Sequence, residues 1–177
     1  MTTNTTSCLI CGAPLQYQDI AEEMTCAICG RTFSSNAYCE NGHFVCDGCH
    51  AAPAVAVVRY LGMTTISKDP VEIATAMINC PSVHMHGPEH HILTGAALLA
   101  AYKNAGGTLD IPVSIAEMIL RVSLVPGGFC GLAGACGAGV SAGIFYSIIT
   151  KTNPLSTNSW REANLLTAAC LTDIGNH

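Results

Sequence analysis

The sequence has few charged side chains. Only 11% of its 177 residues are Asp, Glu, Lys or Arg, well below the roughly 25% that is typical of soluble domains. Half of the residues are hydrophobic, and the mean hydropathy is +0.40. Such a composition indicates an interior rich in small buried side chains, or a surface that another subunit or protein covers. We therefore expect a homo-oligomer or a bound partner protein.

Long apolar runs are also missing. The longest candidates, Ile92–Tyr102 and Ala138–Ile149, are interrupted by Gly, Thr or Ser and fall short of the ~18 uninterrupted apolar residues of a membrane span. The chain does not open with a basic segment followed by an apolar run, which is how a secretory signal peptide begins. We expect a cytoplasmic protein without a membrane-spanning helix.

Basic residues are scarcest near the N-terminus. Up to Tyr60 the basic residues are Arg31 and Arg59, against five acidic ones. Proteins that bind nucleic acid need clustered Lys and Arg to neutralise phosphates. The composition therefore excludes nucleic acid from the expected partners.

Cysteine, by contrast, is abundant. Seven of the eleven cysteines fall within the first 49 residues, and six of these form three Cys-x-x-Cys pairs. In a cytoplasmic protein such pairs more often hold metal than form disulfides. With one more cysteine and one histidine they make eight candidate ligands, enough for two tetrahedral zinc sites. The eight are Cys8, Cys11, Cys26, Cys29, Cys39, His43, Cys46 and Cys49. His50 comes next and is expected to be spare.

The eight ligands can be divided sequentially or in a cross-brace. The spacing from Cys26 to Cys49 resembles the first six ligands of a RING finger, in which the first and third pairs share one ion. The downstream Cys-x-x-Cys of a RING finger is missing, and the upstream pair would replace it in a permuted version. We favour the cross-brace, which groups Cys26, Cys29, Cys46 and Cys49 around one ion and Cys8, Cys11, Cys39 and His43 around the other. Such closed sites are structural. Iron in a rubredoxin-like site is the alternative metal, and ubiquitin-ligase activity does not follow.

The rest of the chain is predicted to be mostly helical. Asp69 is a candidate N-cap, with Pro70 at the first helical position and Glu72 closing a capping box; this helix should end near Ile78. Further helices are expected over about 87–104, 112–122 and 137–150, and after Pro154. We therefore expect a mainly α fold, in which a small binuclear zinc-binding module (residues 1–50) precedes an α-helical bundle (residues 51–177).

Four histidines lie within the eight residues His84–His91, just before and on the first turn of a predicted helix. The positive end of the helix dipole favours neutral imidazoles, which can bind metal or accept protons. Glu89 could act as a base or orient a histidine. The alternative is a hydrogen-bonded loop in which Glu89 complements the dipole. The candidate catalytic residues are Glu89, His90 and His91, and the candidate cofactor ligands here are His84 and His86.

A glycine-rich segment, Pro126–Gly143, contains Cys130 and Cys136, each followed by glycine. A cysteine in a loop that leads into a helix is a place where the thiolate is favoured. These two cysteines are candidate ligands for an iron–sulfur cluster or another metal, together with the histidines, or they form a reactive thiol pair. The alternative is close helix packing in which both thiols behave as small apolar groups.

Together, the cysteine-rich N-terminus, the stretch HMHGPEHHILTGAALLAAYKNAGG (His84–Gly107) and the Cys-Gly stretch Cys130–Phe145 resemble a domain-of-unknown-function family of methanogenic archaea and anaerobic bacteria. The resemblance covers nearly the whole chain. Relatives are sometimes attached to, or encoded beside, methyltransferase-type or radical-chemistry proteins, which implies methyl or sulfur metabolism. Longer members continue with a Gly-Gly-Pro-Arg-Cys-Cys-like tail, so either a site that needs this tail is incomplete here or the chain is truncated. A weaker, local similarity is to iron–sulfur dehydratases of serine.

Two hypotheses follow. In the first, the protein is a cytoplasmic metalloprotein of anaerobic metabolism whose helical domain carries a second metal or iron–sulfur site that acts on a small substrate. In the second, it is a non-catalytic zinc-binding adaptor that docks a methyltransferase or a radical enzyme.

Overall fold

The N-terminal part of the chain is a small two-stranded sheet. The computed structural model describes residues 7–84 and 87–177. Strands β1 (Leu15–Thr25) and β2 (Thr32–Cys39) pair antiparallel, with an irregularity between Tyr17 and Glu22. Most side chains of β1 are exposed, and in β2 only Cys39 is buried. The sheet therefore has almost no apolar core of its own.

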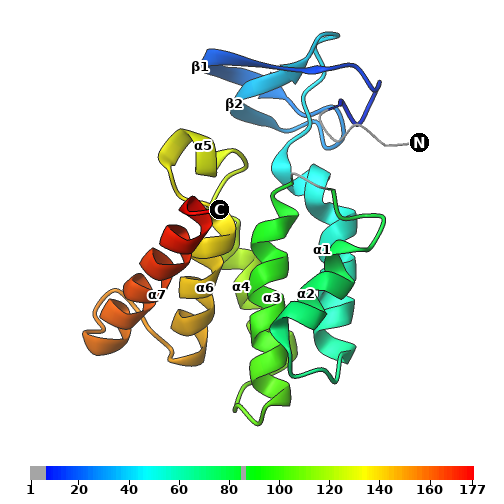
Figure 1. Cartoon of the computed structure of the whole chain (residues 1–177). Coiled ribbons are helices and arrows are strands. Elements are labelled where there is room, and N and C mark those ends of the chain that lie inside the picture. The colour runs from blue at the N-terminus through cyan, green and yellow to red at the C-terminus, as the bar shows by residue number, and fades with distance from the viewer. Residues whose placement is uncertain (1–6, 85–86) are drawn as a thin grey trace.

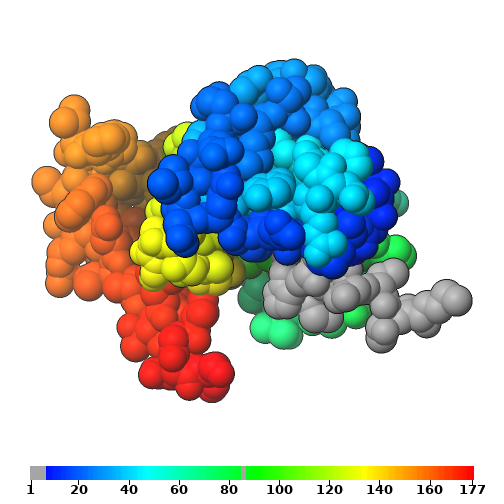
Figure 2. Space-filling view, turned by 90° about the horizontal axis from the view of Figure 1, so that it is seen from above, coloured from blue at the N-terminus to red at the C-terminus, as the bar shows by residue number. Residues whose placement is uncertain are grey.

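Seven helices follow in the described part of the chain, and they account for more than half of its residues (Figure 1). The sheet lies over one end of the helical domain (Figure 1), and the view from above in Figure 2 shows the N-terminal part of the chain in front of the helices. None of these helices, within the described ranges, is long and apolar enough to cross a membrane. The helices are α1 (Asp47–Thr64), α2 (Pro70–Ile78), α3 (Glu89–Asn104), α4 (Ile111–Val122), α5 (Phe129–Ala133), α6 (Gly137–Ile149) and α7 (Asn158–Gly175).

Helix α2 begins where the sequence predicts. The side chain of Asp69 accepts a hydrogen bond from the amide of Val71 at 2.8 Å, and Pro70 occupies the first helical position. The predicted capping box differs in one respect. The carboxylate of Glu72 accepts a hydrogen bond from the hydroxyl of Ser67 at 2.6 Å. The same hydroxyl accepts a hydrogen bond from the amide of Asp69 at 3.2 Å. Ser67 thus lies between the two groups that a capping box joins directly.

Two helices were not predicted. Helix α1 contains Pro53, a residue that disfavours helix interiors because it lacks an amide donor. The expected boundary at residue 50 falls inside α1, so Cys49 and His50 belong to its first turns. Helix α5 has only five residues, too few for a periodic pattern to be visible.

Helix α3 is the centre of the helical domain. It packs against α1, α2, α4 and α6, while α7 packs against α6. Glycine and alanine on α3 let neighbouring helices approach from several sides. The largest fully buried apolar side chains of this core are Met77, Leu93, Leu99, Ile115, Met118 and Val58.

The contact between α6 and α7 depends on Gly143. A Cβ atom at this position would lie 2.9 Å from the carbonyl oxygen of Ala163 and would overlap the side chain of Thr167. Gly143→Ala is therefore expected to lower the free energy of unfolding by about 1–3 kcal/mol, measured by urea denaturation. Gly175→Ala is the matched control, because nothing lies within 4 Å of a Cβ at this position in α7. Equal losses in both variants would contradict close packing at Gly143.

Candidate metal centres

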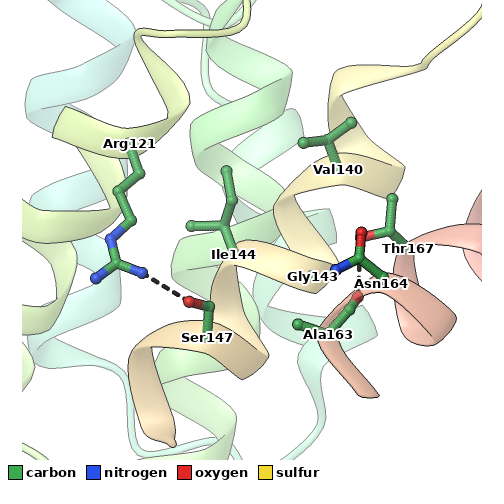
Figure 3. A pocket seen from close by; sticks show the side chains of 8 residues that line it. All are labelled: Arg121, Val140, Gly143, Ile144, Ser147, Ala163, Asn164 and Thr167. Carbon is green, nitrogen blue, oxygen red and sulfur yellow. Dashed lines mark hydrogen bonds between the residues drawn. The ribbon is translucent and has the colours of Figure 1, made fainter. Parts of the chain in front are cut away.

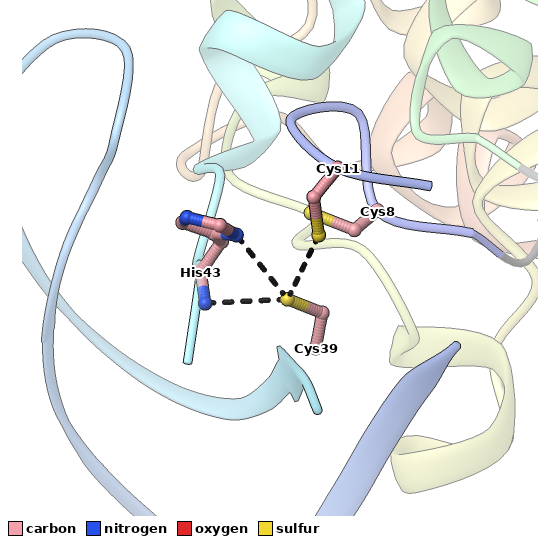
Figure 4. Close-up of side chains that lie close together, drawn as sticks. All are labelled: Cys8, Cys11, Cys39 and His43. Atoms are coloured by element: carbon pink, nitrogen blue, oxygen red, sulfur yellow. Dashed lines mark hydrogen bonds between the residues drawn. The ribbon is translucent and has the colours of Figure 1, made fainter. Parts of the chain in front are cut away.

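The first cysteine cluster lies at one end of the sheet, where β1 begins beside the end of β2. Cys8 and Cys11 come from the turn before β1, Cys39 ends β2, and His43 follows four residues later. Their side chains point toward one another (Figure 4). The sulfur of Cys39 lies 3.8 Å from that of Cys11 and 3.5 Å from Nδ1 of His43. The sulfur separation is far longer than the ~2.05 Å of a disulfide, so these are donors that converge on a common point.

Hydrogen bonds favour the thiolate form of Cys11. The side chain of Asn41 donates to the sulfur of Cys11 at 3.4 Å. Together with a hydrogen bond from the backbone of Ala13, it lowers the pKa of Cys11 to about 6. The amide of His43 donates to the sulfur of Cys39 at 3.3 Å, but burial outweighs this hydrogen bond and raises the pKa of that thiol. Thiolate is the form of cysteine that binds metal, so the local backbone favours ligand chemistry.

The second cluster joins the turn between the strands to the start of α1. Cys26 and Cys29 precede β2, Cys46 is the N-cap of α1, and Cys49 lies in its first turn. The sulfurs of Cys29 and Cys46 lie 3.8 Å apart, and the amide of Cys46 donates to the sulfur of Cys26 at 3.3 Å. The structure thus brings the eight predicted ligands together in two groups, in the cross-braced division.

The four thiols of this second cluster affect one another's ionisation. Burial raises the pKa of Cys26, but hydrogen bonds from the backbone of Cys29 and Cys46 outweigh it and lower the value to about 6. Hydrogen bonding to the Cys46 sulfur, together with burial, raises the pKa of Cys49 to about 12. Four adjacent thiolates repel one another unless a cation lies between them. The cluster therefore has the chemistry of a metal site.

A third cluster includes His50, which the sequence predicts to be spare. Donor atoms of His50, His84 and Glu89 all lie within 4.8 Å of one another. Nδ1 of His84 donates to Oε1 of Glu89 at 3.0 Å, and Nδ1 of His50 lies 3.6 Å from Oε2 of the same carboxylate. The rings of His50 and His84 also lie against each other, with centroids 4.8 Å apart and planes tilted by 54°. The signal that could have identified His50 is its place directly after a ligand cysteine, at a helix start.

Glu89 is fully buried although it is ionisable. Burial raises the pKa of its carboxyl group, but the His50 side chain and the backbone amides of Glu89 and His84 hold the value at about 2. The side chain folds back over Gly87, where a Cβ atom would overlap the carboxylate. Glu89 is therefore a carboxylate inside the protein, and Gly87 provides the space that it occupies.

The other predicted histidines have different surroundings. Nε2 of His90 donates to the carbonyl oxygen of His84 at 2.6 Å and so fixes the loop before α3. The ring of His91 lies against Gly137 of α6, and burial lowers its pKa. His86 lies outside the described residues. Of the four histidines in this stretch, the structure thus assigns His84 to the third cluster.

Cys130 and Cys136 do not join any of these clusters. Cys130 lies on α5 and is exposed, and Cys136 is the half-buried N-cap of α6. Within residues 7–84 and 87–177, no group of three or more candidate metal ligands includes either of them. An iron–sulfur cluster is usually held by four cysteines. Among the described residues, no set of ligands of this kind forms around Cys130 or Cys136.

Grooves on the helical domain lie elsewhere. One of about 190 Å³ separates α4, α6 and α7, and the side chain of Arg121 there donates to the hydroxyl of Ser147 at 2.9 Å (Figure 3). Another of about 380 Å³ lies beside it, along α4. No residue of the three clusters lines either groove.

Two cysteine clusters able to bind metal, placed at one end of a helical domain, define the class of a candidate metalloprotein. Residues 58–177 match a family of unknown function, DUF5714, and the chain belongs to that family. The matched region begins in the middle of α1, so the cysteine clusters and His50 precede it, whereas His84 and Glu89 lie within it. Neither the comparison with curated proteins nor that with solved structures gives a match.

Proposed function

We propose that this protein is a metalloprotein in which two structural zinc ions build the N-terminal module and in which the helical domain acts on a small substrate at the end that faces the module. One observation carries the zinc assignment. In a tetrahedral site with Zn–S bonds of about 2.3 Å and Zn–N bonds of about 2.0 Å, the sulfurs are about 3.8 Å apart and sulfur and nitrogen about 3.5 Å. The corresponding distances here are 3.8 Å in both clusters and 3.5 Å from Cys39 to His43.

The donor sets favour zinc over iron. A rubredoxin-like iron site needs four thiolates, which only the cluster that ends at Cys49 offers. Three thiolates and one imidazole, as in the cluster that includes His43, are a set typical of structural zinc. Both sets are closed, because four protein ligands complete a tetrahedron. They are therefore suited to holding the fold together and leave no position for a substrate.

The module would hold one end of the helical domain. Cys46 and Cys49 belong to the start of α1, so an ion in their cluster fixes the first turn of that helix. In the same turn, Asp47 accepts a hydrogen bond from the amide of Gly127 at 2.7 Å, which ties in the loop before α5. His50 lies on this turn as well and faces Glu89. The zinc module thus supports the polar end of the domain, where we place the working site.

The free cysteines and the family resemblance support a cytoplasmic location and a role in metabolism. All eleven cysteines are free, which fits a reducing cytoplasm. The resemblance to proteins of anaerobes points to methyl or sulfur metabolism. We do not extend the proposal to an iron–sulfur cluster at Cys130 and Cys136, because no further ligand is grouped with them.

Metal analysis of cysteine variants tests the zinc assignment. Cys8→Ser and Cys26→Ser each remove one of the eight donors and are expected to lower the zinc content per chain by at least one ion, measured by mass spectrometry after anaerobic purification. Cys170→Ser is the matched control. Cys170 is half-buried on α7 and belongs to no cluster of the described residues, so the zinc content should stay at the wild-type value. Unchanged zinc in the first two variants, or iron in place of zinc, would contradict the assignment.

A non-catalytic adaptor is the second candidate, and one observation favours it. Large apolar side chains are strongly exposed on the helical domain, among them Leu124, Leu132 and Leu155. Exposed apolar groups can form contacts with another protein, such as a methyltransferase, a radical enzyme or a second copy of this chain. A protein that never holds more metal than the two module ions would favour this second function.

A further inference from the structure

Three side chains from separate parts of the chain meet where α1 and α3 begin. His50 lies on α1, His84 lies in the loop before α3, and Glu89 is the first residue of α3. Both helices start beneath the module (Figure 1). The donor atoms of the three side chains lie within 4.8 Å of one another, although His50 is far from the other two in sequence. Helix packing, and not a local motif, brings them together.

Half of the buried carboxylate has partners and half has none. Oε1 of Glu89 accepts from the amide of His84 at 2.9 Å and from its ring at 3.0 Å. Oε2 of Glu89 and Nδ1 of His50 are both buried, and neither makes a hydrogen bond with the residues that the structure describes. They face each other at 3.6 Å. A buried polar atom without a partner is destabilising, and more so when it is charged, so two of them side by side require an explanation.

We propose that His50, His84 and Glu89 bind one divalent transition-metal ion, additional to the two zinc ions of the module. This inference rests on the proposed function, because it supplies the metal of the working site. Donors bound to one ion at about 2.1 Å lie roughly 3.0–3.4 Å apart. The distance from Nδ1 of His84 to Oε1 of Glu89 is 3.0 Å, within this range, and the distance from Nδ1 of His50 to Oε2 is 3.6 Å, slightly longer than the range. The ion would replace the proton between His84 and Glu89 and would give Oε2 and His50 the partner that they lack.

The donor set selects the kind of ion. Imidazole suits zinc, iron, cobalt and nickel, whereas calcium and magnesium prefer oxygen alone. Two imidazoles and one carboxylate leave at least one coordination position free, which is the arrangement of catalytic zinc sites rather than structural ones. Glu89 is fully buried, but the side chains of His50 and His84 are 25% and 31% exposed. The free position therefore opens on the side of the imidazoles.

The charge of the site indicates its ligand. A divalent ion with one carboxylate carries a net charge of about +1, and the N-termini of α1 and α3 add positive partial charge. Such a site favours hydroxide or a small anionic substrate at the free position. The metal would act as a Lewis acid or would activate bound water. The chemical class of the substrate is thus a small molecule with an anionic or carbonyl oxygen.

Equilibrium dialysis of the full chain against zinc, followed by metal analysis, tests the proposal. The wild-type protein should retain three zinc ions per chain. His50→Ala and Glu89→Gln should retain two, with at least a tenfold loss of affinity for the third. His177→Ala, which changes an exposed histidine, is the control and should retain three. Glu89→Gln keeps the shape of the side chain, so a loss of the third ion without a change in helical circular dichroism reports on ligation rather than on folding.

Two results would overturn the proposal. One is a wild-type protein that retains only the two module ions at saturating zinc, in which case the cluster is a hydrogen-bonded core group. The other is a third ion that remains in both His50→Ala and Glu89→Gln. Neither result affects the module, whose two ions are tested by the cysteine variants. Loss of module zinc with a third ion still bound would instead contradict the proposed function.

Discussion

Removal of zinc by a strong chelator under reducing conditions is expected to unfold the N-terminal module and to leave the helical domain folded. Most side chains of β1 are exposed, and the sheet buries almost no apolar surface. Under the proposed function its stability would come from the zinc ions, since apparent zinc-binding free energies of structural sites are about 10–16 kcal/mol. Amide hydrogen exchange followed by mass spectrometry should show complete loss of protection in Leu15–Thr25 and Thr32–Cys39.

The helical domain contains its own control for this experiment. Amides in the centre of α3 are surrounded by buried apolar side chains and should keep their protection after chelation. Protection in the first turn of α1 should fall, because Cys46 and Cys49 lie there. A sheet that stays protected without metal would contradict the structural role of the ions, and readdition of zinc should restore protection if the loss is reversible.

Leu99→Ala is expected to destabilise the helical domain by about 2–5 kcal/mol, the usual cost of removing a large buried side chain. Leu99 is completely buried on α3, the helix against which four others pack. Thermal or urea denaturation monitored by helical circular dichroism measures the loss. Because the residue is remote in sequence from the cysteine clusters, the variant should still bind the module zinc.

Leu155→Ala is the matched control for this substitution. The same side chain is removed, but Leu155 is 92% exposed, and exposed substitutions usually change stability by less than about 0.5 kcal/mol. Equal effects of the two variants would mean that α3 is not the centre of the core. A loss of zinc in Leu99→Ala would mean that module and domain fold as one unit.

The helices that could be predicted are those whose starts are marked in the sequence. Asp69 followed by Pro70 defines the beginning of α2, because a capping side chain and a fixed φ act locally. Helix α1 carries the opposite signal in Pro53. It forms nevertheless, because its buried residues, including Val58, pack against the domain core. Tertiary packing therefore outweighs the low helix propensity of proline, and this packing cannot be inferred from the local sequence.

The resemblance to a family of unknown function, proposed from the cysteine-rich N-terminus together with the histidine and Cys-Gly stretches, is confirmed for residues 58–177. The match does not include the cysteine-rich N-terminus, and the range of organisms stays a prediction. The prediction of cysteine clusters able to bind metal is also confirmed. The identity of the metal stays a prediction. Of the residues predicted for a second site, His84 and Glu89 lie together. Cys130 lies on α5, and Cys136 lies directly before α6.

The sequence by itself determined the donors of the two cysteine clusters, because Cys-x-x-Cys spacing lets a single turn supply two ligands to one ion. The low fraction of charged residues is likewise a property of the composition alone. The tertiary structure decided the rest. His50 appeared spare beside Cys49, and only the packing of α1 against α3 brings it to Glu89. A contact between helices depends on which faces the whole core buries, and this is a property of the complete fold rather than of any short segment.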